Sequence, residues 1–142
     1  MLAVSGFLGR VATPAQAQAG PPNAGYYLIV HGRHATTPVD RSFVAQAFLK
    51  KIRKWPDGII IQPVDLEPNS SVRQRYSIDV LGRSIDAVRS YWQQMIFSGR
   101  ELPPAELPGD EDVVSFVART PGAIGYVSPA VPLKGVKIVA LR

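Results

Sequence analysis

Cysteine is absent from this chain of 142 residues. Its absence excludes disulfide bonds, thiolate metal sites and cysteine nucleophiles, but leaves the compartment open because many exported bacterial proteins also lack cysteine. The glycine-rich motifs that cradle phosphates in P-loop and dinucleotide-binding proteins are missing as well. No stretch approaches the ~20 consecutive apolar residues that span a bilayer, so the sequence predicts a protein that is not membrane-spanning.

Signals for catalysis and for metal binding are equally sparse. Ser70 and Ser71 do not lie in a Gly-x-Ser-x-Gly elbow, and no base is placed beside them by the sequence. The two histidines, His31 and His34, fall short of the four ligands of a structural zinc, and no Asp, Glu or Cys cluster completes the set. We therefore expect no enzymatic activity, no metal and no cofactor, and we interpret His31 and Gly32 as a polar loop that can contribute to a ligand cleft.

The composition is that of one globular domain, with 46% hydrophobic and 19% charged residues. A net charge of +5 is compatible with an anionic ligand, with weak nucleic-acid affinity or only with solubility. The basic cluster at residues 50–54 precedes Trp55, but a solvated basic face is several times more common than a nucleic-acid site. We expect no nucleic-acid partner.

The N-terminal segment, MLAVSGFLGRVATPAQAQAG, predicts export. Residues 2–8 are a short apolar run, and alanines at alternate positions of 15–19 match the small residues that a signal peptidase reads. No Lys or Arg precedes the apolar run, so the basic leader is missing. We interpret residues 1–19 as the remnant of a signal peptide, with a disordered tail as the alternative. Residues 20–25 are interpreted as a linker and 26–142 as one domain.

Beyond this segment, strand-like and helix-like patterns alternate. Strands are expected at 26–31, 59–65, 123–128 and 136–141, and helices at 40–54, 71–81, 84–97 and from 110 onward. Pro63 suggests that strand pairing ends at that position, and the proline-rich stretch 99–108 reads as an extended surface loop. Trp92 lies on the apolar stripe of its helix and is expected to be structural. The order predicts an α/β fold with an open, mostly parallel sheet and helices on both faces.

Residues 67–76, EPNSSVRQRY, place two arginines where a helix is expected to begin. The first N–H groups of a helix carry partial positive charge, so cations are unfavourable there and anions are favourable. Asn69 or Ser70 can cap the helix, and a bound phosphate, sulfate or carboxylate would neutralise Arg73 and Arg75. Because ligands collect at the carboxyl ends of parallel strands, this position after the strand at 59–65 favours an anion site.

A simpler interpretation of the same segment remains open. Asn69 and Ser70 can form an ordinary cap that is followed by solvated arginines. Those arginines can pair with Glu67, with Asp79 or with no residue.

The chain resembles a known family in several segments: AFLKKIRKWPDG, PVDLEPNSSVRQRY, a helix ending in YWQQMIFSGR, and TPGAIGYVS. They are similar to the phosphate-binding, substrate-capturing components of bacterial ABC transporters, and more narrowly to short single-lobe relatives. The most specific pieces are the Phe-Leu-Trp-Asp-Gly pattern of residues 48–58 and residues 121–126. The resemblance spans residues 26–142 and implies one lobe of a type II periplasmic-binding-protein fold, periplasmic localisation and capture of inorganic phosphate or a similar oxyanion.

The phosphate loop of that family reads roughly Arg-Ser-Asp-Gly-Ser-Gly-Thr, and only its second serine is retained here, as Ser70. The resemblance therefore implies an anion site of Ser70 with Asn69 and Ser71 as further donors and Arg73 as a substitute cation. A full binding protein is about twice as long and closes two lobes on its ligand. We therefore expect a partner protein or a second lobe, with a role in phosphate uptake or sensing. The alternative is an interaction or scaffold module that keeps the fold without the ligand.

Overall fold

The computed structural model of the protein describes residues 25–35 and 37–142. The predicted signal-peptide remnant (1–19) lies outside these residues, as does the predicted linker (20–25) apart from Gly25. Within the described ranges, no helix combines the length and the apolar character needed to cross a bilayer.

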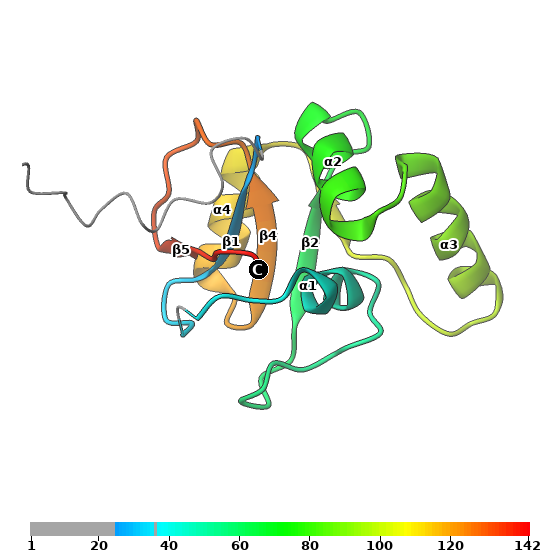
Figure 1. Cartoon of the computed structure of the whole chain (residues 1–142), viewed down its shortest axis with the longest axis horizontal. Helices are drawn as coiled ribbons and strands as arrows, with labels where there is room; N and C mark the ends of the chain where they lie inside the picture. The colour runs from blue at the N-terminus through cyan, green and yellow to red at the C-terminus, as the bar shows by residue number, and fades with distance from the viewer. Residues whose placement is uncertain (1–24, 36) are drawn as a thin grey trace, which may run out of the picture.

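The described residues form a five-stranded sheet with the order β3-β2-β4-β1-β5 (Figure 1). The strands are β1 (Tyr27–His31), β2 (Gln62–Leu66), β3 (Ala105–Leu107), β4 (Ala123–Val127) and β5 (Val136–Ile138). β2 pairs parallel with β3 and β4, whereas β1 is antiparallel to both β4 and β5. The predicted open α/β sheet is thus confirmed, with a parallel core and antiparallel strands along one side.

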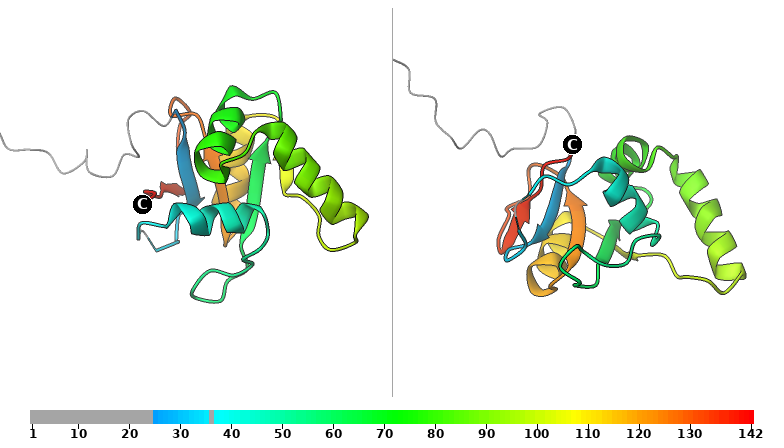
Figure 2. Two further views of the ribbon diagram at one scale, coloured as in Figure 1. Left: turned by 45° about the vertical axis from the view of Figure 1, so that its right-hand side comes forward. Right: turned by 60° about the horizontal axis from the view of Figure 1, so that its bottom comes forward.

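Helices cover both faces of this sheet, as predicted. They are α1 (Arg41–Phe48), α2 (Ser71–Tyr76), α3 (Ile85–Phe97) and α4 (Asp110–Arg119), and α2 continues directly into a π-helical turn, η2 (Ser77–Leu81). Helix α4 lies on one face, whereas α1 and α2 lie on the other (Figure 2). Three acidic residues in the first turn of α4 favour its start, because they complement the partial positive charge of the helix N-terminus.

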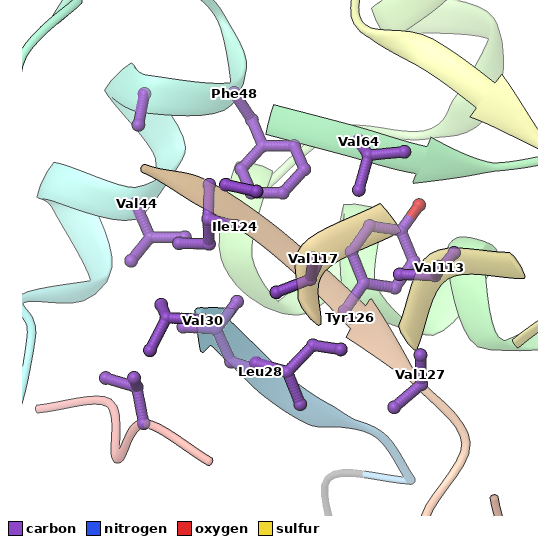
Figure 3. Packing of buried hydrophobic residues seen from close by; sticks show 14 of the residues in the cluster. Leu28, Val30, Val44, Phe48, Val64, Val113, Val117, Ile124, Tyr126 and Val127 are labelled. Carbon is purple, nitrogen blue, oxygen red and sulfur yellow. The ribbon is translucent and has the colours of Figure 1, made fainter. Parts of the chain in front are cut away.

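The core lies between the sheet and these two helical layers (Figure 3). Val113 and Val117 of α4 and Val44 of α1 are fully buried, so both layers contribute to one apolar cluster. The strands supply its centre, with Leu28, Ile29, Val30, Val64, Ile124, Tyr126 and Val127. Burying this apolar area is the main favourable contribution to folding.

The two sequence pieces with the most specific resemblance meet in the structure. The indole nitrogen of Trp55 donates a hydrogen bond to the carbonyl oxygen of Gly122 at 3.0 Å. Gly122 has a φ of +85°, and a Cβ there would lie 2.2 Å from the carbonyl oxygen of Ile60. A Cβ on Gly125 would lie 2.8 Å from a methyl carbon of Val113, so glycine lets α4 approach β4 closely. Both glycines therefore have structural causes.

Strand β2 changes partner at Pro63. Gln62 and Pro63 pair with β4, whereas residues 64–66 pair with β3. The sequence predicted that strand pairing ends at Pro63. Pairing with β4 does end there, but the strand itself continues and pairs with β3. The backbone N–H of Leu66 instead donates to the hydroxyl of Tyr126 at 3.2 Å. A side chain thus replaces the backbone ladder between these two strands.

Helix α3 stands to one side of the sheet in Figures 1 and 2. Trp92 is buried, as expected, with 6% of its surface exposed, but it does not belong to the apolar cluster of the sheet. The hydroxyl of Tyr91 donates to the carbonyl oxygen of Leu49 at 2.9 Å and ties α3 to the end of α1. Trp55, by contrast, belongs to the main cluster.

Helix α1 ends at Phe48, six residues before the end predicted from the sequence, which was 54. Lys50 adopts a left-handed conformation with a φ of 55°, and the N–H of Lys51 donates to the carbonyl oxygen of Gln46 at 2.8 Å. This is the Schellman arrangement that ends many helices, with a lysine at the position where glycine is usual.

The predicted surface loop 99–108 contains strand β3. Prolines on both sides of this strand make the sequence read as a loop. Residues 105–107 nevertheless pair parallel with the second half of β2 at the edge of the sheet. A short edge strand of this kind has too few residues to leave a periodic signal.

Candidate functional site

Helix α2 begins directly after the carboxyl end of β2, at the edge of the sheet where ligands of α/β proteins collect. Ser70 is the N-cap residue, with an extended backbone, and its hydroxyl oxygen accepts a hydrogen bond from the N–H of Arg73 at 3.2 Å. The carbonyl oxygen of Glu67 accepts from the N–H of Ser70 at 3.0 Å. This turn holds the start of the helix in a defined orientation.

Asn69 and Ser71 flank the cap, and both side chains are exposed. In the described part of the chain, the N–H groups of Ser71 and Val72 make no hydrogen bond. The structure therefore brings three of the predicted anion-site residues, Asn69, Ser70 and Ser71, together with two free backbone donors. Free N–H groups, an amide and hydroxyls are the donors that an oxyanion accepts from.

Arg73 is placed differently from the expectation of a cation exposed at the helix start. It is only 8% exposed, and its guanidinium donates to the carbonyl oxygen of Leu66 at 2.8 Å. The same group forms an ion pair with Glu106 and lies 4.0 Å from a carboxylate oxygen of Asp65. Arg73 thus forms a buried cation with internal partners, whereas Arg75 is exposed. Two carboxylates on neighbouring strands explain why an arginine is favourable here.

Asp65 is the buried carboxylate of this cluster, at 7% exposure. The hydroxyl of Tyr126 donates to its Oδ1 at 2.7 Å and accepts from the N–H of Leu66. Burial raises the pKa of Asp65 to about 6, although the charge of Arg73 and the Tyr126 hydrogen bond oppose this change. Burial, together with Asp65, also raises the pKa of the Tyr126 hydroxyl. Tyr126 therefore stays protonated and acts as a donor to Asp65 at all physiological pH values.

Tyr76 stacks on Tyr126, with ring centroids 3.8 Å apart and planes within 11°. Its hydroxyl is buried and has no hydrogen-bond partner in the described part of the protein. Burial, followed by the nearby Asp65, raises its pKa well above the usual value. The cluster at the carboxyl end of β2 therefore includes a second neutral phenol, which packs between the helix and the sheet.

Asp65, Glu106 and Tyr126 belong to this cluster but were not among the site residues predicted from the sequence. Asp65 could have been identified from the sequence, because an acidic residue within the apolar run IIIQPVDL needs a partner if the strand is buried. Glu106 and Tyr126 carried none, since their proximity depends on strand order. Only the sheet topology brings β3 and β4 to opposite sides of β2.

A cleft with a volume of about 610 Å³ adjoins the start of α2. Asn69 and Gln74 line it from α2 and the preceding loop, and Ser84 and Arg89 line it from the start of α3. The guanidinium of Arg89 lies 4.0 Å from the carboxylate of Asp86 in an exposed pair. Such a pair is weak, so Arg89 is available to a ligand in this cleft.

His31 and Gly32 lie at the carboxyl end of β1, on the opposite side of the molecule from the carboxyl end of β2. β1 is antiparallel to β4, and β4 is parallel to β2, so the carboxyl ends of β1 and β2 point in opposite directions. His31 and Gly32 therefore do not lie beside Ser70, as they would if β1 were parallel to β2. They line a separate cleft with a volume of about 620 Å³ that also includes Arg119.

In the part of the chain that the structure describes, no group of three or more His, Asp or Glu side chains is arranged to hold a metal ion. His34 packs its ring against Trp55 at 4.3 Å between centroids, and its Nδ1 lies 2.7 Å from the carbonyl oxygen of Ala35. His34 has a packing role in this arrangement.

Several solved structures with a similar arrangement of strands and helices carry the names of phosphate-transport proteins. A phosphate ABC transporter substrate-binding protein with bound phosphate from Clostridium perfringens superposes with a TM-score of 0.63 at 20% identity, over 82% of this chain and 44% of its own. The fold matches one lobe of a phosphate-transport binding protein.

Two further structures agree with this match. An ABC-type phosphate transport receptor from Vibrio cholerae has a TM-score of 0.60 at 18% identity over 93% of this chain. PstS from Borrelia burgdorferi has a TM-score of 0.57 at 13% identity over 94% of this chain. The chain covers 54% and 55% of these two proteins, so it spans about half the length of the structures it matches. No family model and no curated protein matches the sequence.

Proposed function

We propose that this protein binds inorganic phosphate or a similar oxyanion at the start of α2, through Asn69, Ser70, Ser71 and Arg73. The observation that carries the proposal is the position of this helix start at the carboxyl end of a central parallel strand, in a fold shared with phosphate-transport binding proteins. The free N–H groups of Ser71 and Val72 supply donors, and the dipole of the helical segment favours negative charge there.

Arg73 takes part by exchanging a partner. The side chain of Glu106 is 43% exposed on the edge strand β3, so its carboxylate can move into water, whereas Asp65 is held by Tyr126. An oxyanion that replaces the Glu106 carboxylate on the guanidinium keeps the charge of Arg73 compensated. Competition with this internal carboxylate weakens the binding of phosphate, and we expect a dissociation constant in the roughly micromolar to millimolar range.

We further infer that the protein is exported and non-enzymatic and works in ABC-type phosphate uptake or sensing. The solved proteins with this fold are, by name, transport receptors and substrate-binding proteins. Because one lobe leaves an anion at the α2 start open to water, a second lobe from a partner protein or another copy of the chain is expected to close over it. The periplasm is the compartment that fits this role.

The alternative is an interaction or scaffold module that keeps the fold and binds no anion. The burial of Arg73 between two carboxylates favours this alternative, because the cation already has partners. In that case the cluster serves only to hold α2 against β2 and β3.

Calorimetric titration with phosphate at low salt distinguishes the two functions. The parent protein should release or absorb heat and gain thermal stability by mass action on the folded state. Glu106→Gln should raise the affinity several-fold because it removes the competing carboxylate, and Arg73→Lys should lower it by about tenfold because lysine cannot bind two oxygens at once. Arg75→Gln is the matched control, since Arg75 is exposed on the same helix.

Two results would contradict phosphate binding. One is the lack of heat and of thermal stabilisation at millimolar phosphate in both the parent and Glu106→Gln. The other is an equal loss of affinity in Arg73→Lys and Arg75→Gln, which would indicate general electrostatic attraction. Either result would support the scaffold function.

A further inference from the structure

A second charged cleft lies at the amino end of β2, at the opposite end of this strand from the start of α2. It has a volume of about 450 Å³ and runs between the end of α1, the segment that leads into β2 and the segment before β3. Its charged lining consists of three cations, Lys50, Arg53 and Lys54, and one carboxylate, Glu101. The cleft therefore carries an excess of positive charge.

The internal contacts of this cleft leave that excess in place. Glu101 forms an ion pair with Arg53, and its other oxygen lies 3.9 Å from the Nζ of Lys50. Lys54 makes no ion pair within the described residues. One carboxylate thus serves two cations while a third has no counter-charge, and an anionic group entering the cleft would be attracted by all three.

Lys50 occupies its position at a conformational disadvantage. Its φ of 55° lies in the left-handed region, where a glycine would end α1 without strain. Burial, followed by the neighbouring charge of Arg53, lowers the pKa of the Lys50 ammonium, so the local structure also disfavours its charge. The backbone of Lys50 ends α1 as a glycine would, and its side chain is not needed for this, but the side chain places a cation at the cleft.

Apolar side chains line the same cleft beside these cations. Ile60 is 61% exposed, and Ile52 and Phe116 are half-buried at its wall. An exposed isoleucine next to an uncompensated lysine suits a ligand that has both an apolar body and a negative charge. Inorganic phosphate would use the charge but leave the apolar wall uncovered.

We propose that this cleft binds a small organic anion, a carboxylate or phosphate ester with an aromatic or aliphatic body. The anionic group lies between Lys50 and Lys54, and the apolar body covers Ile60 and Phe116. This site is separate from the oxyanion site proposed at α2, because the two lie at opposite ends of β2.

Naphthalene-2-carboxylate is a suitable probe, with naphthalene-2-carboxamide and acetate as its matched partners. The carboxamide keeps the apolar body without the charge, and acetate keeps the charge without the body. In calorimetric titration of the full chain, we expect the naphthoate to bind at least about tenfold more tightly than either partner. Millimolar inorganic phosphate should compete only weakly, so failure of phosphate binding at α2 would leave this result unaffected.

Three variants test the role of Lys50. Lys50→Gln should weaken naphthoate binding by about tenfold, whereas Lys134→Gln, an exposed lysine on a distant loop, should leave it unchanged. Lys50→Gly should weaken binding equally while raising the melting temperature by a few degrees, because glycine relieves the left-handed strain. A purely structural lysine would not produce this opposite pair of effects.

The proposal is overturned by any of three outcomes. Binding of the carboxamide as tightly as the carboxylate would indicate an apolar surface without charge selectivity. Equal effects of Lys50→Gln and Lys134→Gln would indicate general attraction to a basic protein. A lower melting temperature of Lys50→Gly would indicate that the contact of Lys50 with Glu101 is a structural one.

Discussion

The two ends of strand β2 carry charged clusters of opposite design. At the carboxyl end, one buried arginine, Arg73, is surrounded by Asp65, Glu106 and a backbone carbonyl. At the amino end, Lys50 and Arg53 share Glu101, and a third cation, Lys54, makes no ion pair within the described residues. Where water is excluded, the cation has a full set of partners, and where water enters, the charges are left uncompensated.

The difference follows from the cost of removing charge from water. A buried ion without partners loses several kcal/mol of hydration, so the cluster around Arg73 must be complete in order to exist. In the cleft at the amino end, Arg53 and Lys54 are exposed and keep much of their hydration, so they do not need a full set of partners, whereas Lys50 is half-buried. The first cluster is therefore expected to contribute to stability, and the second to be available for ligands.

Removal of Arg73 should have the largest effect on stability. We expect Arg73→Ala to lower the free energy of unfolding by about 3 kcal/mol, because it leaves Asp65 buried without a cation. The sequence alone suggests a much smaller effect, because a cation at an exposed helix start is unfavourable. Urea unfolding at pH 7.5 measures the change.

Arg75→Ala is the control for that experiment. Arg75 lies two residues away on the same helix but is exposed, so its loss should change the free energy of unfolding by less than about 0.5 kcal/mol. Equal effects of the two substitutions would mean that the buried cluster contributes no more than surface charge, and the contrast between the two ends of β2 would fail.

The pH dependence of stability should identify Asp65 as the buried carboxylate. Its pKa is about 6 in the folded protein and near 3.8 in the unfolded chain, so between these values the folded state binds more protons. Stability should therefore fall as the pH rises from about 4 to about 6, by on the order of 3 kcal/mol, and then level off. Asp65→Asn should remove this slope, as measured by urea midpoints at each pH.

Asp79 should give a pH dependence of stability with the opposite sign, and at a lower pH than Asp65. Burial disfavours its ionised form, but hydrogen bonds with Arg41 and Tyr26 outweigh burial and hold the pKa of the carboxyl below its usual value. Its stabilising contribution is present above about pH 4 and is lost only as the pH falls further. A slope between pH 4 and 6 that persists in Asp65→Asn would show that another group carries it.

Glu101→Gln should lower the free energy of unfolding by much less than Arg73→Ala. It removes the carboxylate between Lys50 and Arg53 and leaves three cations together. The Glu101 side chain is only 15% exposed, but that of its partner Arg53 is 65% exposed, so solvent screens much of their attraction. We expect a loss of about 0.5–1 kcal/mol in low salt that shrinks as salt is added. A loss of unfolding free energy as large as that of Arg73→Ala, or one that does not change with salt, would indicate that solvent does not screen the charges of this cleft. The two ends of β2 would then not differ in the way described.

Much of the fold could be predicted because local patterns were strong. The apolar run YYLIVH and the helical stripe of residues 84–97 lie within one or two residues of β1 and α3. Strand β3 could not be predicted, because three residues between prolines have no periodicity. The direction of β1 was also inaccessible, since an apolar run fits a parallel or an antiparallel strand equally well.

The candidate site shows the same division between local and long-range information. Ser70 was correctly predicted as a possible cap, because Ser followed by a helical pattern is a local signal. The environment of Arg73 could not be predicted, since its partners lie on β2 and β3, and Glu106 is 33 residues away in the chain. The position of an arginine along a helix does not tell which carboxylates the sheet brings beside it.

Helix α3, which stands apart from the sheet, implies that the protein does not open as one unit. Its amide protons should exchange with solvent through a local opening that leaves the sheet intact, at a lower free energy than those of β4. Residues 85–97 would then be a separate cooperative unit, tied to the end of α1 by the hydrogen bond from Tyr91. Sequence changes in this unit would be tolerated by the rest of the molecule, because they leave the main core untouched.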